Sequence, residues 1–113
     1  MTFEDIIRAQ QQAHAGDTSA LSALLSDEFT WTSVSKSAVG IAERNKAMTL
    51  AWATSLPDRK ISKARALLET DDVIVGEEHA HSDNMGDHVF MTFYRLSGGK
   101  IIELRHVRGV APE

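Results

Sequence analysis

The chain has no cysteine, which excludes disulfide bonds, thiolate nucleophiles and zinc sites built on cysteine, and leaves its redox compartment open. It has only two prolines in 113 residues, and 42% of its residues are hydrophobic, a composition that disfavours disordered and collagen-like chains. No apolar run approaches the ~20 residues that span a bilayer, and the first residues are acidic where a secretion signal is basic. We therefore expect one domain over residues 1–113, located in the cytoplasm and without a membrane partner.

Positive charge is in the minority: Lys and Arg number 12 against 16 Asp and Glu, which gives a net charge of -4. The basic residues are also scattered along the sequence instead of gathering in one stretch. Binding to nucleic acid requires a positive surface that neutralises phosphates. The sequence therefore predicts no nucleic-acid partner.

Apolar residues at helical spacing predict helices over residues 2–15, 17–26 and 41–54. Thr2 can cap the first helix, and Asp5 can complete a capping box. Gly16 suits the end of that helix, and Asp17 can cap the second one directly afterwards. Pro57 follows the third helix and cannot continue it.

Alternating β-branched and aromatic residues predict strands over residues 29–34, 60–69, 73–81, 88–96 and 99–108. Residues 35–40 are small and polar and are expected to form a loop. Turn-forming residues separate the last four strands, which predicts an antiparallel meander of four, preceded by the helices and one isolated strand. Because helices and strands are segregated along the chain, we expect an α+β fold.

The last predicted strand has no plainly polar face. Alternation places Ile102, Leu104, His106 and Arg108 on one face, and Ile101, Glu103, Arg105 and Val107 on the other. His106 is therefore a polar residue on a partly apolar face and needs an explanation. On the other face, Glu103 and Arg105 are expected beside Val89, Met91 and Phe93, a mixed surface suited to a dimer interface.

Three short motifs, in this order and spacing, resemble the nuclear transport factor 2-like (NTF2-like) superfamily and, within it, the SnoaL-like polyketide cyclase group. They are AGD at residues 15–17 between two helices, LSDEFTW at 25–31 leading into the first strand, and GKIIE at 99–103 opening the last strand. The resemblance implies a cone in which three N-terminal helices close a strongly curved, mainly antiparallel sheet around an internal pocket. It also implies a homodimer packed through the sheet.

The resemblance assigns site positions as well. In members similar to ketosteroid isomerase, the general base and the oxyanion-binding pair fall on Ser33, Ala9 and Thr92, none of which keeps the required chemistry. We therefore do not expect ketosteroid-type isomerisation. In the cyclases and epoxide hydrolases, the acid/base carboxylate falls on His106, and a charged pair of the hydrolases falls on His79 and His81. The residue types differ, so the resemblance implies only that these positions face the pocket.

Three histidines converging on one pocket would suit general acid/base catalysis, because imidazole titrates near neutral pH. His79 and His81 share a strand face with Glu77, which could orient one ring, and His106 comes from another strand of the same sheet. The alternative is that they are hydrogen-bonded pocket-wall or surface residues. Three histidines also suit zinc, but an intervening strand separates the two sets, so we expect neither a metal nor a cofactor.

Further pocket-lining residues are predicted by strand alternation: Trp31, Ser33, Phe90, Thr92, Tyr94, Leu104 and, at the mouth, Arg108. Such a lining suits a flat, mainly apolar ligand held by few hydrogen bonds. The alternative is ordinary core packing. His14 is expected to cap the end of the first helix, and Trp52 is expected to be packing.

Two functions remain open on these residues. The first is a cofactor-independent acid/base enzyme of cyclase, isomerase or hydrolase type that acts on a small apolar molecule, with His106 transferring the proton and His79 or His81 assisting. The second is a non-catalytic ligand-binding or dimerisation module of the same fold. Whether the chain is an enzyme is not decided by its sequence.

Overall fold

The computed structural model describes residues 1–35 and 43–110. Its elements follow the chain in the order α1 (Phe3–His14), α2 (Ser19–Leu24), β1 (Leu25–Ser33), β2 (Glu43–Asn45), α3 (Lys46–Thr54), β3 (Lys60–Glu69), β4 (Val73–Ser82), β5 (Gly86–Ser97) and β6 (Lys100–Val110). The predicted α+β class is confirmed. Among the described helices, none has the length and apolar character needed to span a membrane.

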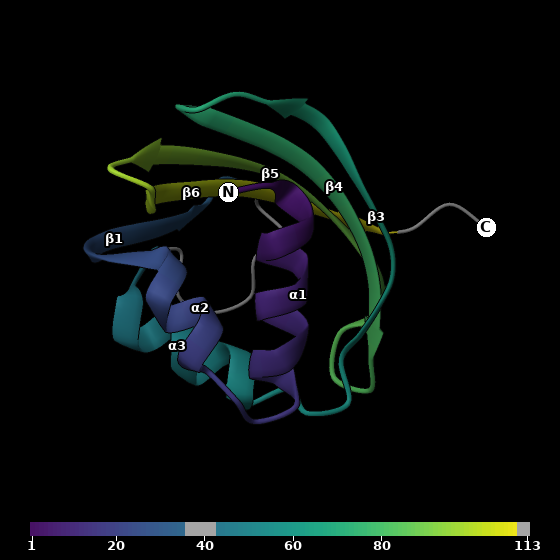
Figure 1. Ribbon diagram of the computed structural model, residues 1–113. Coiled ribbons are helices and arrows are strands. Elements are labelled where there is room, and N and C mark those ends of the chain that lie inside the picture. The colour runs from purple at the N-terminus through teal and green to yellow at the C-terminus, as the bar shows by residue number, and fades with distance from the viewer. Residues whose placement is uncertain (36–42, 111–113) are drawn as a thin grey trace.

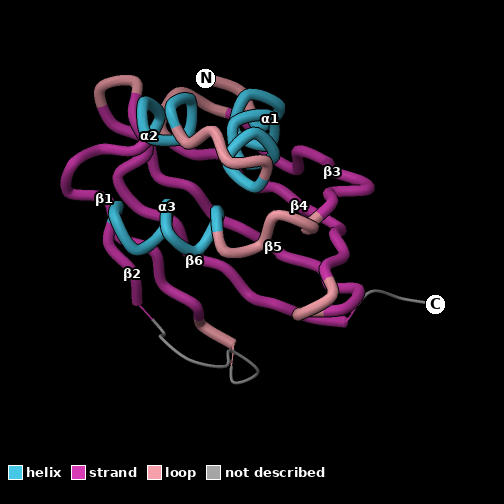
Figure 2. Tube along the Cα trace, turned by 90° about the horizontal axis from the view of Figure 1, so that it is seen from below, coloured by secondary structure: helices cyan, strands magenta, loops and turns pink. Residues whose placement is uncertain are grey.

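One mixed sheet contains all six described strands, in the order β2-β1-β6-β5-β4-β3. Strands β3 to β6 form the predicted antiparallel meander. The first strand is not isolated, because β1 pairs in parallel with β6 and antiparallel with β2. The sheet curves around α1, and the helices lie on its concave side (Figures 1 and 2).

Two predicted boundaries in the first half of the chain are wrong. Residues 43–45, expected to be helical, form the edge strand β2, and helix α3 begins only at Lys46. Asn45 defines this start, since its side chain accepts a hydrogen bond of 2.9 Å from the backbone N–H of Met48. Strand β1 begins at Leu25, inside the predicted second helix. Most of the expected loop at 35–40, and residues 41 and 42, lie outside the described residues.

The capping and turn residues predicted at other helix and strand ends are found there in the structure. Thr2 and Asp5 form the predicted capping box of α1, with bonds of 2.8 and 3.2 Å between backbone N–H groups and side-chain oxygens. Gly16 follows the helix at φ 108°, which favours glycine. Gly98 and Gly99, both at positive φ, form the two-residue turn between β5 and β6.

A register shift changes the inner face of β6. Glu103 lies opposite Arg95, but Ile101 lies opposite Leu96, so Ile102 is an extra residue in the pairing. As a result Ile101, at 1% exposure, joins the inner face with Leu104 and His106, where alternation predicted Ile102.

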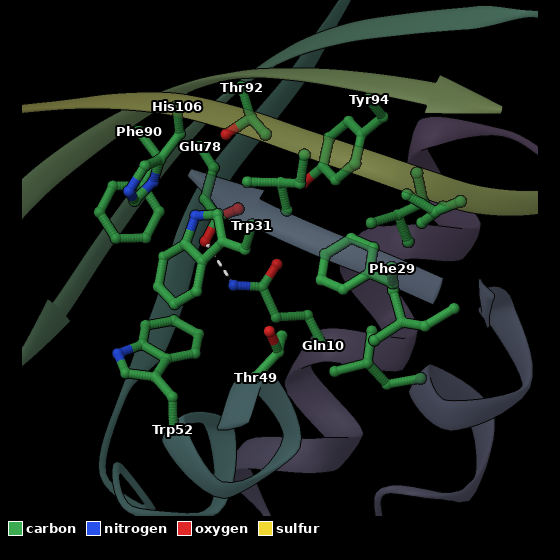
Figure 3. Close-up of a pocket in the computed structure, with 15 residues that line it drawn as sticks. Gln10, Phe29, Trp31, Thr49, Trp52, Glu78, Phe90, Thr92, Tyr94 and His106 are labelled. Carbon is green, nitrogen blue, oxygen red and sulfur yellow. Dashed lines mark hydrogen bonds between the residues drawn. The ribbon is translucent and has the colours of Figure 1, made fainter. Parts of the chain in front are cut away.

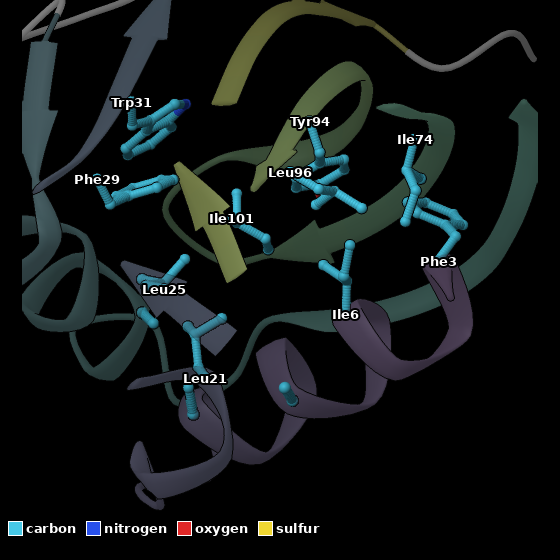
Figure 4. Close-up of a cluster of buried hydrophobic side chains, with 13 residues drawn as sticks. Phe3, Ile6, Leu21, Leu25, Phe29, Trp31, Ile74, Tyr94, Leu96 and Ile101 are labelled. Carbon is cyan, nitrogen blue, oxygen red and sulfur yellow. The ribbon is translucent and has the colours of Figure 1, made fainter. Parts of the chain in front are cut away.

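The hydrophobic core lies between the concave face of the sheet and the helices (Figure 4). Its members are Phe3, Ile6, Ala9 and Ala13 of α1, Leu21 of α2, Leu25, Phe29 and Trp31 of β1, Ala53 of α3, and Ile74, Tyr94, Leu96 and Ile101 of the meander. Helix α1 approaches β4 closely at Gly76, where an added Cβ would lie 2.2 Å from Cε1 of Phe3. Glycine at this position allows the helix to pack against the sheet.

We expect the Gly76→Ala variant to lose about 1–3 kcal/mol of unfolding free energy, because the new methyl group forces the buried Phe3 ring to move. Urea unfolding followed by circular dichroism measures the change. The matched control is Gly109→Ala on β6, where an added Cβ has no atom within 4 Å. Equal stability of the two variants would contradict this role of Gly76.

Candidate functional site

An inner chamber of about 40 Å³ lies between the sheet and the helices (Figure 3). Helices line it with Ile6, Gln10, Leu21, Thr49 and Trp52, and strands line it with Leu25, Phe29, Trp31, Glu78, Phe90, Thr92, Tyr94, Ile101, Leu104 and His106. Most of this wall is aromatic or aliphatic. A ligand in this chamber would therefore make mostly apolar contacts, and its polar atoms could pair only with the few polar side chains of the wall.

An outer chamber of about 330 Å³ adjoins the inner one. It is lined by Trp31, Ser33, Arg44, Trp52, Ser55, Leu56, Asn84, Met85, Phe90, His106 and Arg108. Four of these residues, Trp31, Trp52, Phe90 and His106, line both chambers. The outer chamber reaches the surface at Ser55 and Asn84, which are exposed.

The structure distributes the predicted pocket residues over both chambers. Trp31, Phe90, Thr92, Tyr94 and Leu104 line the inner chamber, and Ser33 and Arg108 line the outer one. Trp52, expected to be packing only, also lines both chambers, and its ring centroid lies 5.2 Å from that of Trp31.

His106 lies in the wall shared by the two chambers, with 6% of its surface exposed. Its ring centroid lies 4.9 Å from that of Trp31 and 4.6 Å from that of Phe90, in edge-on contacts. Burial, and then the positive charges of Arg44, Arg59 and Arg108, lower the pKa of His106 to about 4. The imidazole is therefore neutral at neutral pH and offers one donor and one acceptor.

The expected convergence of His79 and His81 on the same pocket is wrong. Both point to the convex side of the sheet: Nε2 of His79 lies 2.7 Å from Oε1 of Glu77, and Nδ1 of His81 lies 2.8 Å from Oδ1 of Asp87. Neither residue lines a chamber. The cause is the register of β4, which pairs Glu78 with Phe90 and so turns Glu78 inward. Within residues 1–35 and 43–110, no group of three His, Cys, Asp or Glu side chains is placed to hold a metal ion.

A buried polar network, missed from the sequence, is centred on Arg59 beyond the end of α3. Arg59 is fully buried, and Glu78 is 1% exposed. Nη2 of Arg59 donates to Oε2 of Glu78 at 2.5 Å, and Nε2 of Gln10 donates to the same oxygen at 2.9 Å. Among the described residues, Glu78 is the only buried carboxylate, and it points into the inner chamber (Figure 3).

Two histidines complete this network. His14 and His88 are each 1% exposed, and their Nδ1 atoms lie 2.8 and 2.9 Å from the carbonyl oxygens of Ala53 and Gly86. Each Nδ1 therefore carries the proton, and each Nε2 accepts a bond of 3.0 Å from Arg59. Burial, with the charge of Arg59, lowers the pKa of both rings and keeps them neutral. The prediction that His14 caps α1 is thus wrong, because its ring reaches α3.

Tyr94 lines the same inner chamber as Glu78. Burial, and then the negative charge of Glu78, raise the pKa of the Tyr94 phenol, so the hydroxyl keeps its proton. The inner chamber therefore combines one buried carboxylate with one phenol donor. Neighbouring groups of this kind can accept a proton from a ligand and stabilise the charge that develops on it.

No known family's sequence profile matches the chain, and no curated protein matches it by sequence. Solved structures do match. An NTF2-like protein of unknown function from Cytophaga hutchinsonii has a TM-score of 0.71 at 14% identity, covering 94% of this chain and 85% of that one. A candidate ketosteroid isomerase from Kribbella flavida has a TM-score of 0.75 at 13% identity, with coverages of 97% and 76%. IdmH, a proposed polyketide cyclase from Streptomyces antibioticus, has a TM-score of 0.70 at 16% identity, with coverages of 93% and 90%. The chain therefore has the NTF2-like fold, as the sequence resemblance predicted.

The lowered pKa of His106 predicts that the protein loses stability in mild acid. Its folded pKa, about 4, lies below the unfolded value of 6.5, so its stabilising contribution is complete above pH 6.5 and is lost as the pH falls towards 4. Between pH 7 and pH 5, we expect the unfolding free energy of the wild type to fall by about 2 kcal/mol more than that of His106→Asn. Urea titrations at both pH values measure this.

Parallel pH profiles of the wild type and the His106→Asn variant would contradict the buried neutral state of His106.

Proposed function

We propose that the protein binds a small, flat, mainly apolar organic molecule and transfers a proton on it without a cofactor, with Glu78 as the acid/base group. One observation carries this proposal: the one buried carboxylate among the described residues points into a chamber whose wall is mostly aromatic and aliphatic. Titratable groups in such surroundings are typical of acid/base sites. Isomerisation, cyclisation and hydrolysis all need such a group.

The hydrogen bonds of Glu78 favour this role. Arg59 and Gln10 both donate to Oε2, which fixes the carboxylate, while Oε1 accepts no hydrogen bond from the described residues. Oε1 is therefore available to take a proton from a carbon or oxygen of the ligand. The electron pair left behind would move to a ligand oxygen, and the protonated Tyr94 could donate a hydrogen bond to that oxygen.

The sizes of the chambers suit a ligand that extends through both. The outer chamber, at about 330 Å³, can hold a one- or two-ring body between Trp31, Trp52 and Phe90. The inner chamber, at about 40 Å³, admits only a narrow reacting end. His106 lies where they adjoin and, in this proposal, positions the ligand as a neutral imidazole. The isomerase and cyclase names of the structural neighbours support a function of this general class.

We expect the protein to accelerate exchange of the α-hydrogens of 2-tetralone, a flat apolar ketone, in D₂O. In this reaction the α C–H bond breaks, its proton passes to Glu78 and an enolate forms; the proton on Glu78 exchanges with D₂O, and the enolate takes the deuteron back, which regenerates the carboxylate. The Glu78→Gln variant should lose about 100-fold or more of the protein-catalysed rate, and Glu78→Asp less. Proton NMR follows the exchange, and calorimetric binding of 2-naphthol reports whether the pocket is intact.

The control for this experiment is His79→Gln, which changes a ring on the convex side of the sheet and should keep the wild-type rate. Full activity of Glu78→Gln would show that another group moves the proton. Binding of 2-naphthol without any exchange would show that the chain is a binder and not an enzyme of this class.

The protein has a second candidate role, as a non-catalytic module that dimerises through its sheet. The exposed apolar residues on the convex face of the sheet favour this role. The described helices leave this face uncovered (Figure 1). Met91 and Val107 lie opposite each other on β5 and β6 and are 38% and 42% exposed. With Val75 and Phe93 they line a shallow groove. An apolar surface of this kind is typical of the centre of a homodimer interface.

We expect sedimentation equilibrium at about 50 µM to show a dimer for the wild type and a monomer for Met91→Glu, because the substitution places charge at the centre of this interface. Leu67→Glu is the control, since Leu67 is 45% exposed but lies on the edge strand β3. A monomeric wild type, or a dimer that survives Met91→Glu, would contradict this interface.

A further inference from the structure

The outer chamber carries positive charge in a protein whose net charge is -4. Arg44 of β2 and Arg108 of β6 contribute guanidinium groups to its wall, and the described residues that line it include no carboxylate. Arg44 is half-buried, and its guanidinium carbon lies 4.1 Å from the centroid of the Trp31 ring. In the described part of the chain it has neither an ion pair nor a hydrogen bond. Within the described residues, no anion of the protein therefore balances this cation at the chamber.

Two hydrogen-bonding groups in the same wall are also unsatisfied. Nε1 of Trp31 and Oγ of Ser33 are both buried and have no hydrogen-bond partner among residues 1–35 and 43–110. Trp31 as a whole is only 5% exposed, so water does not easily replace the missing partner. These residues follow one another on the inner face of β1, and Trp31 lies directly opposite Arg44 in the β1–β2 pairing. An indole N–H can only donate, so it requires an acceptor.

From these groups we infer that the ligand of the outer chamber is an organic acid, whose carboxylate binds between Arg44, Trp31 and Ser33. This inference rests on the proposed small-molecule function and names its substrate class. A guanidinium fork matches a carboxylate with two parallel hydrogen bonds, and the N–H of Trp31 and the O–H of Ser33 supply further donors. The surroundings of His106 in the chamber wall are positive as well, because Arg44, Arg59 and Arg108 each add to the effect of burial in lowering its pKa. The size of the chamber, about 330 Å³, favours an organic acid over inorganic phosphate.

The test compares 2-naphthoate with its neutral counterpart 2-naphthamide, using isothermal titration calorimetry on the full chain. We expect the wild type to bind the carboxylate at least about tenfold more tightly than the amide, because a charge-assisted bond is stronger than a neutral one. The Arg44→Met variant should bind the carboxylate about as weakly as the amide and leave the affinity for the amide within about threefold.

Arg95→Met is the matched control, since Arg95 is an exposed arginine on β5 paired with Glu103. It should keep the wild-type preference. Equal binding of naphthoate and naphthamide by the wild type, a measurement that needs no variant, would overturn the inference and leave the proposed function standing. Tighter binding of inorganic phosphate than of naphthoate would also overturn it. Binding of neither naphthalene compound would overturn the inference together with the proposed function.

Discussion

Arg59 and Glu78 are both withdrawn from water, and a buried ion is stable in a protein only when a partner compensates its charge. Their contact joins the segment after α3 to the middle of β4. Gln10 ties the same carboxylate to α1, and His88 ties the guanidinium to β5. Several segments that are distant in the sequence thus meet at one pair of charges. The position of the helices over the sheet, and hence the chambers between them, depends on this pair.

The network also explains how a carboxylate can remain in an apolar chamber. The Arg59 guanidinium donates to three acceptors, Oε2 of Glu78 and the Nε2 atoms of His14 and His88, and the two histidines are neutral, so they add no competing charge. Among the described carboxylates, Glu78 alone forms an ion pair with this guanidinium. Phe90, which pairs with Glu78 across β4 and β5, and Trp31 belong to the mostly apolar wall of the inner chamber. A fixed charge in such surroundings acts more strongly on a ligand than the same charge in water.

Along β1, alternation indicated the inward direction of Trp31, because Leu25, Phe29 and Trp31 share one apolar face of that strand. In β4 both faces mix polar and apolar residues, so alternation could not decide whether Glu78 or the histidines point inward. The register decides it, and that register depends on the turn in which Gly86 takes φ 66°. No local feature of the sequence indicated that Arg59 is buried, because it follows Pro57 in a stretch that looks like an exposed connection. Its burial depends on a partner 19 residues further along the chain.

The parallel pairing of β1 with β6 has a consequence for the order in which the molecule assembles. These strands are neighbours in the sheet although their paired residues, such as Ser33 and His106, are more than 70 positions apart in the chain. Contacts of such long range form slowly, because a large loop must close before they are gained. During synthesis, the ribosome must release almost the whole domain before Trp31 acquires its neighbours on β6. The chambers are therefore completed last, and a chain interrupted before β6 would have an incomplete sheet and would lack the wall that Leu104, His106 and Arg108 contribute to the chambers.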